Sequence, residues 1–230
     1  MKKTIFLTAI LIVALSFTGC GGFSKNGGDL TITAKAAHGD LLNNQVDEVR
    51  AMGNDGSDDI IIATAPFKNG GFKITLPEKI DGRLLEPMDL ESMFSAVPDL
   101  TVSNKNVVGT EFYNIIAFKN NLMVGAFMFH CSGPTEMGQA FFLLVDGDCK
   151  IYGSQTDPVG SSGKSEIIVD VNLKKGWNIW YLTVMQVGNI TSVKFTTQKP
   201  DLDLKWYFMG GGPLAPPKYV KPFNFFKKKL

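Results

Sequence analysis

The sequence contains few residues of the kinds that usually carry catalysis or bind metals. It has two histidines, His38 and His130, and three cysteines among 230 residues. Neither histidine has a partner at a spacing typical of zinc ligands except the adjacent Cys131, and neighbouring strand residues point to opposite faces. Two histidines and no Gly-x-Ser-x-Gly motif give little basis for a Ser-His-Asp triad. We therefore expect no metal, no cofactor and no enzymatic activity.

The sequence also lacks an excess of charge of either sign. It has 23 basic and 22 acidic residues, and removing the two lysines of residues 1–19 leaves 21 basic residues. Because nucleic acids require a clustered positive field, we expect no nucleic-acid partner. Gly163-Lys164-Ser165 imitates the end of a phosphate-binding loop, but Pro158 replaces the required first glycine and a strand, not a helix, should follow. We therefore expect no nucleotide.

No apolar run is long enough to cross a membrane as a helix. The longest, Ile5–Leu15, falls well short of the roughly 20 residues that a spanning helix needs. It follows two lysines and precedes Thr18-Gly19-Cys20, as in an export signal whose cysteine receives lipid. We predict a signal peptide at 1–19, lipid attachment at Cys20 and a flexible tether at 20–28. The alternative is an ordinary secretory signal in which the cysteine is incidental.

Short runs rich in β-branched and aromatic residues recur between Gly- and Asn-rich turns. This pattern predicts a mainly β fold with little helix, made of one or two antiparallel β-sandwich modules. Asn-Gly and Asp-Gly dipeptides between such runs indicate tight turns. The hairpins expected on this basis are 59–67 with 72–77, 111–119 with 122–129, and 139–145 with 149–153.

Residues 78–100 interrupt this rhythm and contain one or two helical turns that Asp89 caps and Pro98 ends. We place a boundary there, between a small β-sandwich-like domain with a crossover segment (29–100) and a second antiparallel β domain (101–212). A tail rich in Pro, Phe and Lys follows at 213–230. Its phenylalanines either pack onto the body, which we favour, or join the lysines in touching anionic lipid.

Three features resemble the small uncharacterised lipoproteins of Bacteroidales, in the Bacteroidetes. They are the lipobox, in which Phe17 replaces the usual aliphatic residue, the segment Ile62–Pro77 and the segment Leu173–Asn178. The resemblance implies an N-terminal portion like the prealbumin-like or carboxypeptidase-regulatory β-sandwich, and a lipid anchor in the cell envelope. The resemblance also implies that this anchor lies in the outer membrane. The first acid after the cysteine is Asp29, which favours the periplasmic side, because surface lipoproteins of this group often carry acids earlier.

Aromatic residues of the late strands give one hint of a binding site. Exposed Trp177, Trp180, Trp206 and Tyr207 could contact a glycan or a partner, since indoles stack on sugar rings. Strand alternation places Trp177 and Trp180 on opposite faces, so at least one of them belongs to the core.

Asp55, Asp58 and Asp59 gather oxygen atoms in one turn that could contribute to a calcium site. The turn lacks the complete calcium-loop pattern, and a solvated turn is the favoured interpretation. Cys131 and Cys149 should be free buried thiols, because an up-down-up meander would place them at opposite ends of a sheet.

These observations predict a membrane-anchored envelope lipoprotein. Its expected role is a non-enzymatic binding or assembly module for a protein complex. The alternative is a carbohydrate-binding lipoprotein that uses the exposed aromatic residues.

Overall fold

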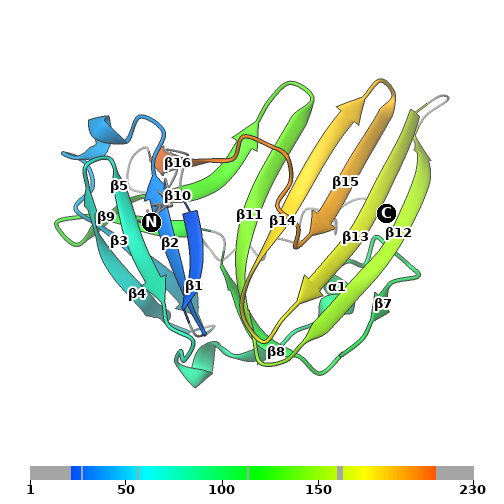
Figure 1. Cartoon of the computed structure of the whole chain (residues 1–230), viewed down its shortest axis with the longest axis horizontal. Helices are drawn as coiled ribbons and strands as arrows, with labels where there is room; N and C mark the ends of the chain where they lie inside the picture. Colours follow the sequence, from blue (N-terminus) through cyan, green and yellow to red (C-terminus); the bar gives the residue numbers. More distant parts are fainter. Residues whose placement is uncertain (1–21, 27, 56, 113, 160–162, 211–230) are drawn as a thin grey trace, which may run out of the picture.

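The computed structural model describes residues 22–26, 28–55, 57–112, 114–159 and 163–210 (Figure 1). Its strands, in chain order, are β1 (Gly22–Asn26), β2 (Asp29–Lys35), β3 (Glu48–Asn54), β4 (Asp59–Lys68), β5 (Gly71–Leu76), β6 (Glu86–Pro87), β7 (Thr101–Val102), β8 (Val108–Phe112), β9 (Asn114–Lys119), β10 (Leu122–Ser132), β11 (Glu136–Val145), β12 (Cys149–Val159), β13 (Gly163–Leu173), β14 (Gly176–Val187), β15 (Ile190–Thr196) and β16 (Lys205–Gly210). Its helical segments are η1 (Gly39–Leu42), η2 (Gly82–Leu84) and α1 (Leu90–Met93).

The strands form one continuous sheet system. The main path runs β1-β2-β5-β4-β3-β9-β10-β11-β14-β15-β13-β12-β7, while β16 pairs with β10, and β8 pairs with β6 and β11. Every strand pairing in the described ranges is antiparallel except that of β13 with β15. The prediction of a mainly β, mostly antiparallel fold with little helix is therefore confirmed.

Two of the three expected hairpins are present. Asn69 and Gly70, with φ of 52° and 72°, join β4 to β5, and Asn120 and Asn121, with φ of 50° and 62°, join β9 to β10. Positive φ at both central residues matches the twist of the flanking strands, and Asn and Gly tolerate it best. Glu111, expected in the second hairpin, lies instead on β8, which pairs with β11.

The third expected hairpin, between 139–145 and 149–153, is wrong. β11 pairs with β14 along its whole length, whereas β12 pairs with β13. Gly147 does not adopt the positive φ of a tight hairpin turn. Asp146 accepts a hydrogen bond from the Val108 backbone N–H, and Asp148 accepts one from that of Lys175. These carboxylates hold the connection against other segments, so the chain leaves β11 without turning back.

The segment that interrupts the strand rhythm covers one face of the sheet. Asp89 caps α1 by accepting a hydrogen bond from the Ser92 backbone N–H, as the sequence predicts. In the part of the chain that the structure describes, no helix has the length and apolar character needed to cross a bilayer. Leu90, Phe94 and Val97 from this segment pack on residues of β11–β15. It lies behind the right-hand sheet in Figure 1.

β11 and β14 lie between two hydrophobic clusters. Phe142 and Trp177 belong to the first, which fills the space between β2, β4 and β5 on one side and β10, β11 and β16 on the other. Phe141 and Trp180 belong to the second, under the α1 segment. Adjacent residues therefore point into different cores. Over most of their length both strands are covered on both faces, which explains their almost continuous apolar sequences.

The first cluster draws on both sides of the boundary expected at residue 100. Phe67 and Phe72 lie before that boundary, and both rings contact Phe127, which lies after it. β3 also pairs with β9 across the boundary. The first cluster and the β3–β9 pairing therefore both cross the boundary expected at residue 100.

The expected flexible tether at 20–28 is largely a strand. β1 pairs with β2 from Gly22↔Thr33 to Asn26↔Asp29, and the Phe23 ring packs 5.3 Å from that of Phe129. This one apolar side chain and the backbone ladder order a polar, glycine-rich segment whose composition suggested flexibility. The described part of the expected tether therefore belongs to the sheet from Gly22 onwards.

Candidate functional site

The tryptophans do not form a binding platform. Trp177, Trp180 and Trp206 are 1%, 2% and 0% exposed, so the exposure that a glycan site requires is absent for all three. Trp177 donates its indole N–H to the Pro77 carbonyl at 2.9 Å. Trp180 stacks on Phe141 at 4.4 Å between centroids, and Trp206 lies 5.2 Å from Phe129. The three tryptophans therefore belong to the hydrophobic clusters and do not form an exposed contact surface.

Tyr207 is the one member of that group that is partly exposed. It faces away from Trp206 on β16, and its ring lies 4.8 Å from that of His130 on the neighbouring β10. A single partly covered ring offers no flat surface for a sugar.

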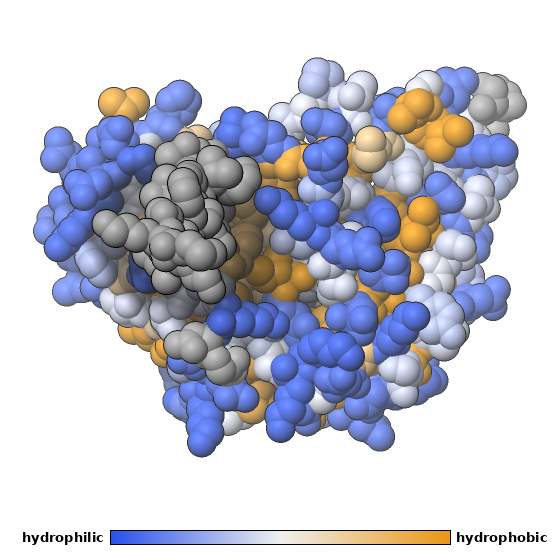
Figure 2. All heavy atoms as spheres, in the orientation of Figure 1, coloured by the Kyte–Doolittle hydropathy of each residue, from blue (hydrophilic) through white to orange (hydrophobic). Residues whose placement is uncertain are grey.

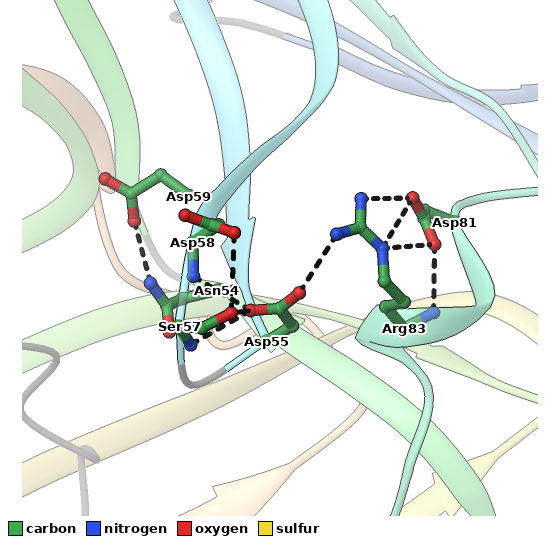
Figure 3. Close-up of polar contacts among 7 residues, drawn as sticks. All are labelled: Asn54, Asp55, Ser57, Asp58, Asp59, Asp81 and Arg83. Carbon is green, nitrogen blue, oxygen red and sulfur yellow. Dashed lines mark hydrogen bonds and ion pairs between the residues drawn. The ribbon is translucent and has the colours of Figure 1, made fainter.

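The Asp-rich turn is closed by its own hydrogen bonds (Figure 3). One carboxylate oxygen of Asp55 accepts the Ser57 and Asp58 backbone N–H groups and the Ser57 hydroxyl. Its other oxygen lies 3.3 Å from the Arg83 guanidinium, which also pairs with Asp81 at 2.8 Å. The Asp58 and Ser57 hydrogen bonds lower the pKa of Asp55 from 3.8 to about 2.

This network favours the solvated-turn interpretation over a calcium site. Asp59 accepts a hydrogen bond from the Asn54 amide, and Asp55 is committed to the turn and to Arg83. A calcium ion needs six to eight oxygen ligands around one point, and the carboxylates of this turn are engaged in the hydrogen bonds and the ion pair described above. Within the described ranges, no group of three or more His, Cys, Asp or Glu side chains is placed to hold a metal ion.

The two described cysteines are free thiols, as predicted. Cys149 is buried, whereas Cys131 is only partly buried, and desolvation raises the pKa of the Cys131 thiol. The reason differs from the expected meander, because β12 does not pair with β11.

The Gly-Lys-Ser sequence forms the first three residues of β13, which pairs with β12. Pro158 pairs with Lys164 and Asp157 with Ser165 in the β12–β13 ladder. A phosphate-binding loop instead leads from a strand into a helix, whose N-terminal amides bind the phosphate. This geometry does not support a nucleotide site at these residues.

A groove of about 910 Å³ opens beside Gly22, the first residue of β1, next to β2. Gly22 and Thr33 mark the end of the β1–β2 ladder, and the β15–β16 connection forms the opposite wall. Buried or partly buried apolar side chains line its floor: Ala34, Phe72, Phe129, Leu202 and Leu204. Figure 2 shows hydrophobic side chains at the bottom of a hollow near the middle of this face, with hydrophilic side chains around it. The size is that of cavities that bind small ligands.

Lysines surround this floor. Lys35, Lys68, Lys73 and Lys199 come from β2, β4, β5 and the β15–β16 connection, and the one acid in the lining is Asp203. Lys35 lies 3.3 Å from Asp40, and Asp203 lies 2.6 Å from Lys205. The groove is therefore apolar at its floor and positive at its rim.

Sequence reasoning missed this groove, because its residues are spread from Gly22 to Leu204. One local signal was available: Lys68 and Lys73 flank the Asn69–Gly70 turn at outward-facing positions of the predicted hairpin. Lys199 and Leu202 reach the groove only through the tertiary fold. Cys20 and the tail at 213–230 lie outside the described residues.

Comparison with protein-family models, characterised proteins and solved structures finds no match for this chain.

Proposed function

We propose that this protein is a lipid-anchored binding module of the bacterial envelope, without catalytic activity. The sequence carries the anchor, through the apolar run at 5–15 and the small residues before Cys20. Several acyl chains on one cysteine hold a protein stably at a bilayer, because each buried methylene contributes about 0.8 kcal/mol. The outer membrane, periplasmic side, is the proposed address, and the Bacteroidales lipoproteins are the proposed family.

The lysine-rimmed groove is the observation that carries the binding role. Its lining begins at Gly22, only two positions after the proposed lipid attachment site. A membrane anchor at Cys20 therefore holds this groove at the bilayer surface. Concave, partly apolar sites with a few polar groups at the edge are the usual form of a binding site.

A second candidate role, assembly with a protein partner, is favoured by apolar side chains at adjoining ends of β14 and β15. Met185, Val187 and Ile190, which lie on one face of the sheet, are 44%, 69% and 45% exposed. Met185 pairs with Glu136 and Ser192 in the sheet, and Val187 with Ile190. Contiguous exposed apolar residues often mark protein–protein contacts.

The anchor is tested by detergent phase partitioning of the full-length chain expressed in a bacterium that processes lipoproteins. The wild type is expected in the detergent phase, and Cys20→Ala is expected to lose that partitioning. Cys131→Ala, which removes a thiol on β10, is the control and should behave as the wild type. Equal partitioning of wild type and Cys20→Ala would overturn the proposal.

A further inference from the structure

The groove combines two features that one ligand must satisfy together. Phe72, Phe129 and Leu204 are almost completely buried, and they form a floor beneath an opening about as large as a drug-sized ligand requires. Exposed lysine residues stand at the rim. A purely polar ligand would make no apolar contact with the floor. A purely apolar ligand would leave the positive charge of the rim lysines uncompensated.

The positive charge of the rim is local. Lys68, Lys73 and Lys199 are exposed, and none of them forms an ion pair with another described residue. The chain as a whole is nearly neutral, with 23 basic and 22 acidic residues, so this excess is not a property of the overall composition. A local field of this kind attracts anions, and the attraction weakens with salt.

The charge of the chain's own tail argues against the tail as the occupant. Residues 213–230 contain five lysines and no acid, so the tail carries the same sign as the rim. Like charges at short range repel, and the tail would bring no compensating group.

The position of the groove close to the proposed anchor indicates that its ligand comes from the membrane. Gly22 lines the groove, and the proposed anchor at Cys20 lies within about 7 Å of it along the chain. Anionic lipid headgroups attract nearby lysines by about 1 kcal/mol each. An acyl chain matches the apolar floor, and the headgroup matches the rim.

We infer that the groove binds an anionic phospholipid of the bilayer, with an acyl chain on the Phe72–Phe129–Leu204 floor and the headgroup between Lys68, Lys73 and Lys199. This inference rests on the proposed membrane anchor.

The test uses the full-length lipidated chain in vesicles whose lipid carries a photoreactive group near the end of one acyl chain. Phosphatidylglycerol vesicles are compared with phosphatidylcholine vesicles, and crosslinked peptides are mapped by mass spectrometry. Crosslinks are expected at Phe72, Phe129, Leu202 or Leu204 with phosphatidylglycerol. The combined change Lys68→Glu, Lys73→Glu and Lys199→Glu should reduce them by roughly tenfold or more.

The matched control reverses three exposed lysines outside the groove lining, Lys79→Glu, Lys164→Glu and Lys175→Glu. It changes the net charge equally and should leave the crosslinks unchanged. Leu202→Trp fills part of the floor without changing the charge, and it should also reduce the crosslinks. A loss in this variant would show that the floor contributes to lipid binding independently of the lysines. Thermal unfolding of each variant checks the fold.

The outcomes separate the two proposals. If the wild type fails to incorporate into phosphatidylcholine vesicles, the anchor itself is wrong. If it incorporates but gives crosslinks outside the groove, equal crosslinks with both lipids, or no loss in the groove variants, the ligand inference is overturned while the anchor stands. Binding of an acidic peptide in the groove without lipid crosslinks would overturn it in the same way.

Discussion

At the scale of single residues, the Asp-rich turn shows how a cluster of acids serves structure. Asp55 accepts three hydrogen bonds from its own turn and faces Arg83 from η2. The turn thereby connects the β3–β4 loop to the segment after β5 (Figure 3). Ionised Asp55 makes these contacts, which is why its pKa falls to about 2.

Acid should weaken this connection over a defined range of pH. A carboxyl whose folded pKa lies below its unfolded value of 3.8 stabilises the fold above that value, and the stabilisation is lost as pH falls towards about 2. Asp55→Asn should therefore lower the free energy of unfolding at pH 6, and the difference from wild type should shrink between about pH 4 and 2. Urea unfolding at several pH values measures it.

The control is Asp99→Asn, which removes one exposed carboxylate elsewhere. It should change the free energy of unfolding by less than about 0.5 kcal/mol at pH 6. A difference between Asp55→Asn and wild type that stays constant down to pH 2 would contradict the assignment.

At the scale of elements, β11 differs from β12 in having both faces buried. Phe141 and Phe142 are 4% and 0% exposed although they are neighbours, whereas on β12 Ile151 is 1% and Tyr152 46% exposed. The difference arises because the α1 segment covers one face of β11 and the first cluster covers the other.

Alanine substitutions should show this difference in burial as a difference in the free energy of unfolding. Phe141→Ala and Phe142→Ala should each lower the free energy of unfolding by about 3–5 kcal/mol, because each removes a ring from a filled core. Ile151→Ala should cost about 2–5 kcal/mol, and Tyr152→Ala only about 1 kcal/mol or less. Chemical unfolding measures all four, and a small effect at either phenylalanine would mean that one face of β11 is open.

The turns give a second prediction at this scale. Gly70 has a φ of 72°, and a Cβ there would lie 2.7 Å from an Asp40 carboxylate oxygen and 2.8 Å from the Asp40 backbone nitrogen. Gly70→Ala should therefore destabilise the protein by more than about 1 kcal/mol.

Gly82→Ala is the matched control, because a Cβ at that position meets nothing within 4 Å. Thermal unfolding of both variants measures the difference, and Gly82→Ala should be neutral or slightly stabilising. Equal effects of the two substitutions would show that the turn does not require glycine.

Local sequence signals predicted those parts of the fold that local chemistry determines. Asn69–Gly70 and Asn120–Asn121 form the expected turns, and Asp89 caps the expected helix. Pairings between distant segments could not be predicted: β15 inserts between β14 and β13, and β8 reaches β11. The groove brings together residues of β1, β2, β4, β5, β10 and the β15–β16 connection, so its residues carried no common local signal. The tryptophans, which did stand out in the sequence, belong to the core.

At the scale of the whole molecule, the sheet and the first cluster join the two halves of the chain into one body. β3 pairs with β9, and Trp206 lies against Phe72 at 5.4 Å between ring centroids. β1 adds the segment after Cys20 to the same body. The proposed anchor at Cys20 would therefore hold the groove end of the molecule near the bilayer, whereas β12 and β13 lie towards the other end of the long axis (Figure 1).

The depth of the groove rim in the membrane tests the proposed anchoring and lipid binding most directly. A fluorescent amino acid replaces Thr33, an exposed residue of the groove lining, or Lys164 near the start of β13, in the full-length lipidated chain held in vesicles that contain brominated phosphatidylglycerol. We expect strong quenching at position 33 and little at position 164. Absence of quenching at position 33, or equal quenching at both positions, would contradict the proposal.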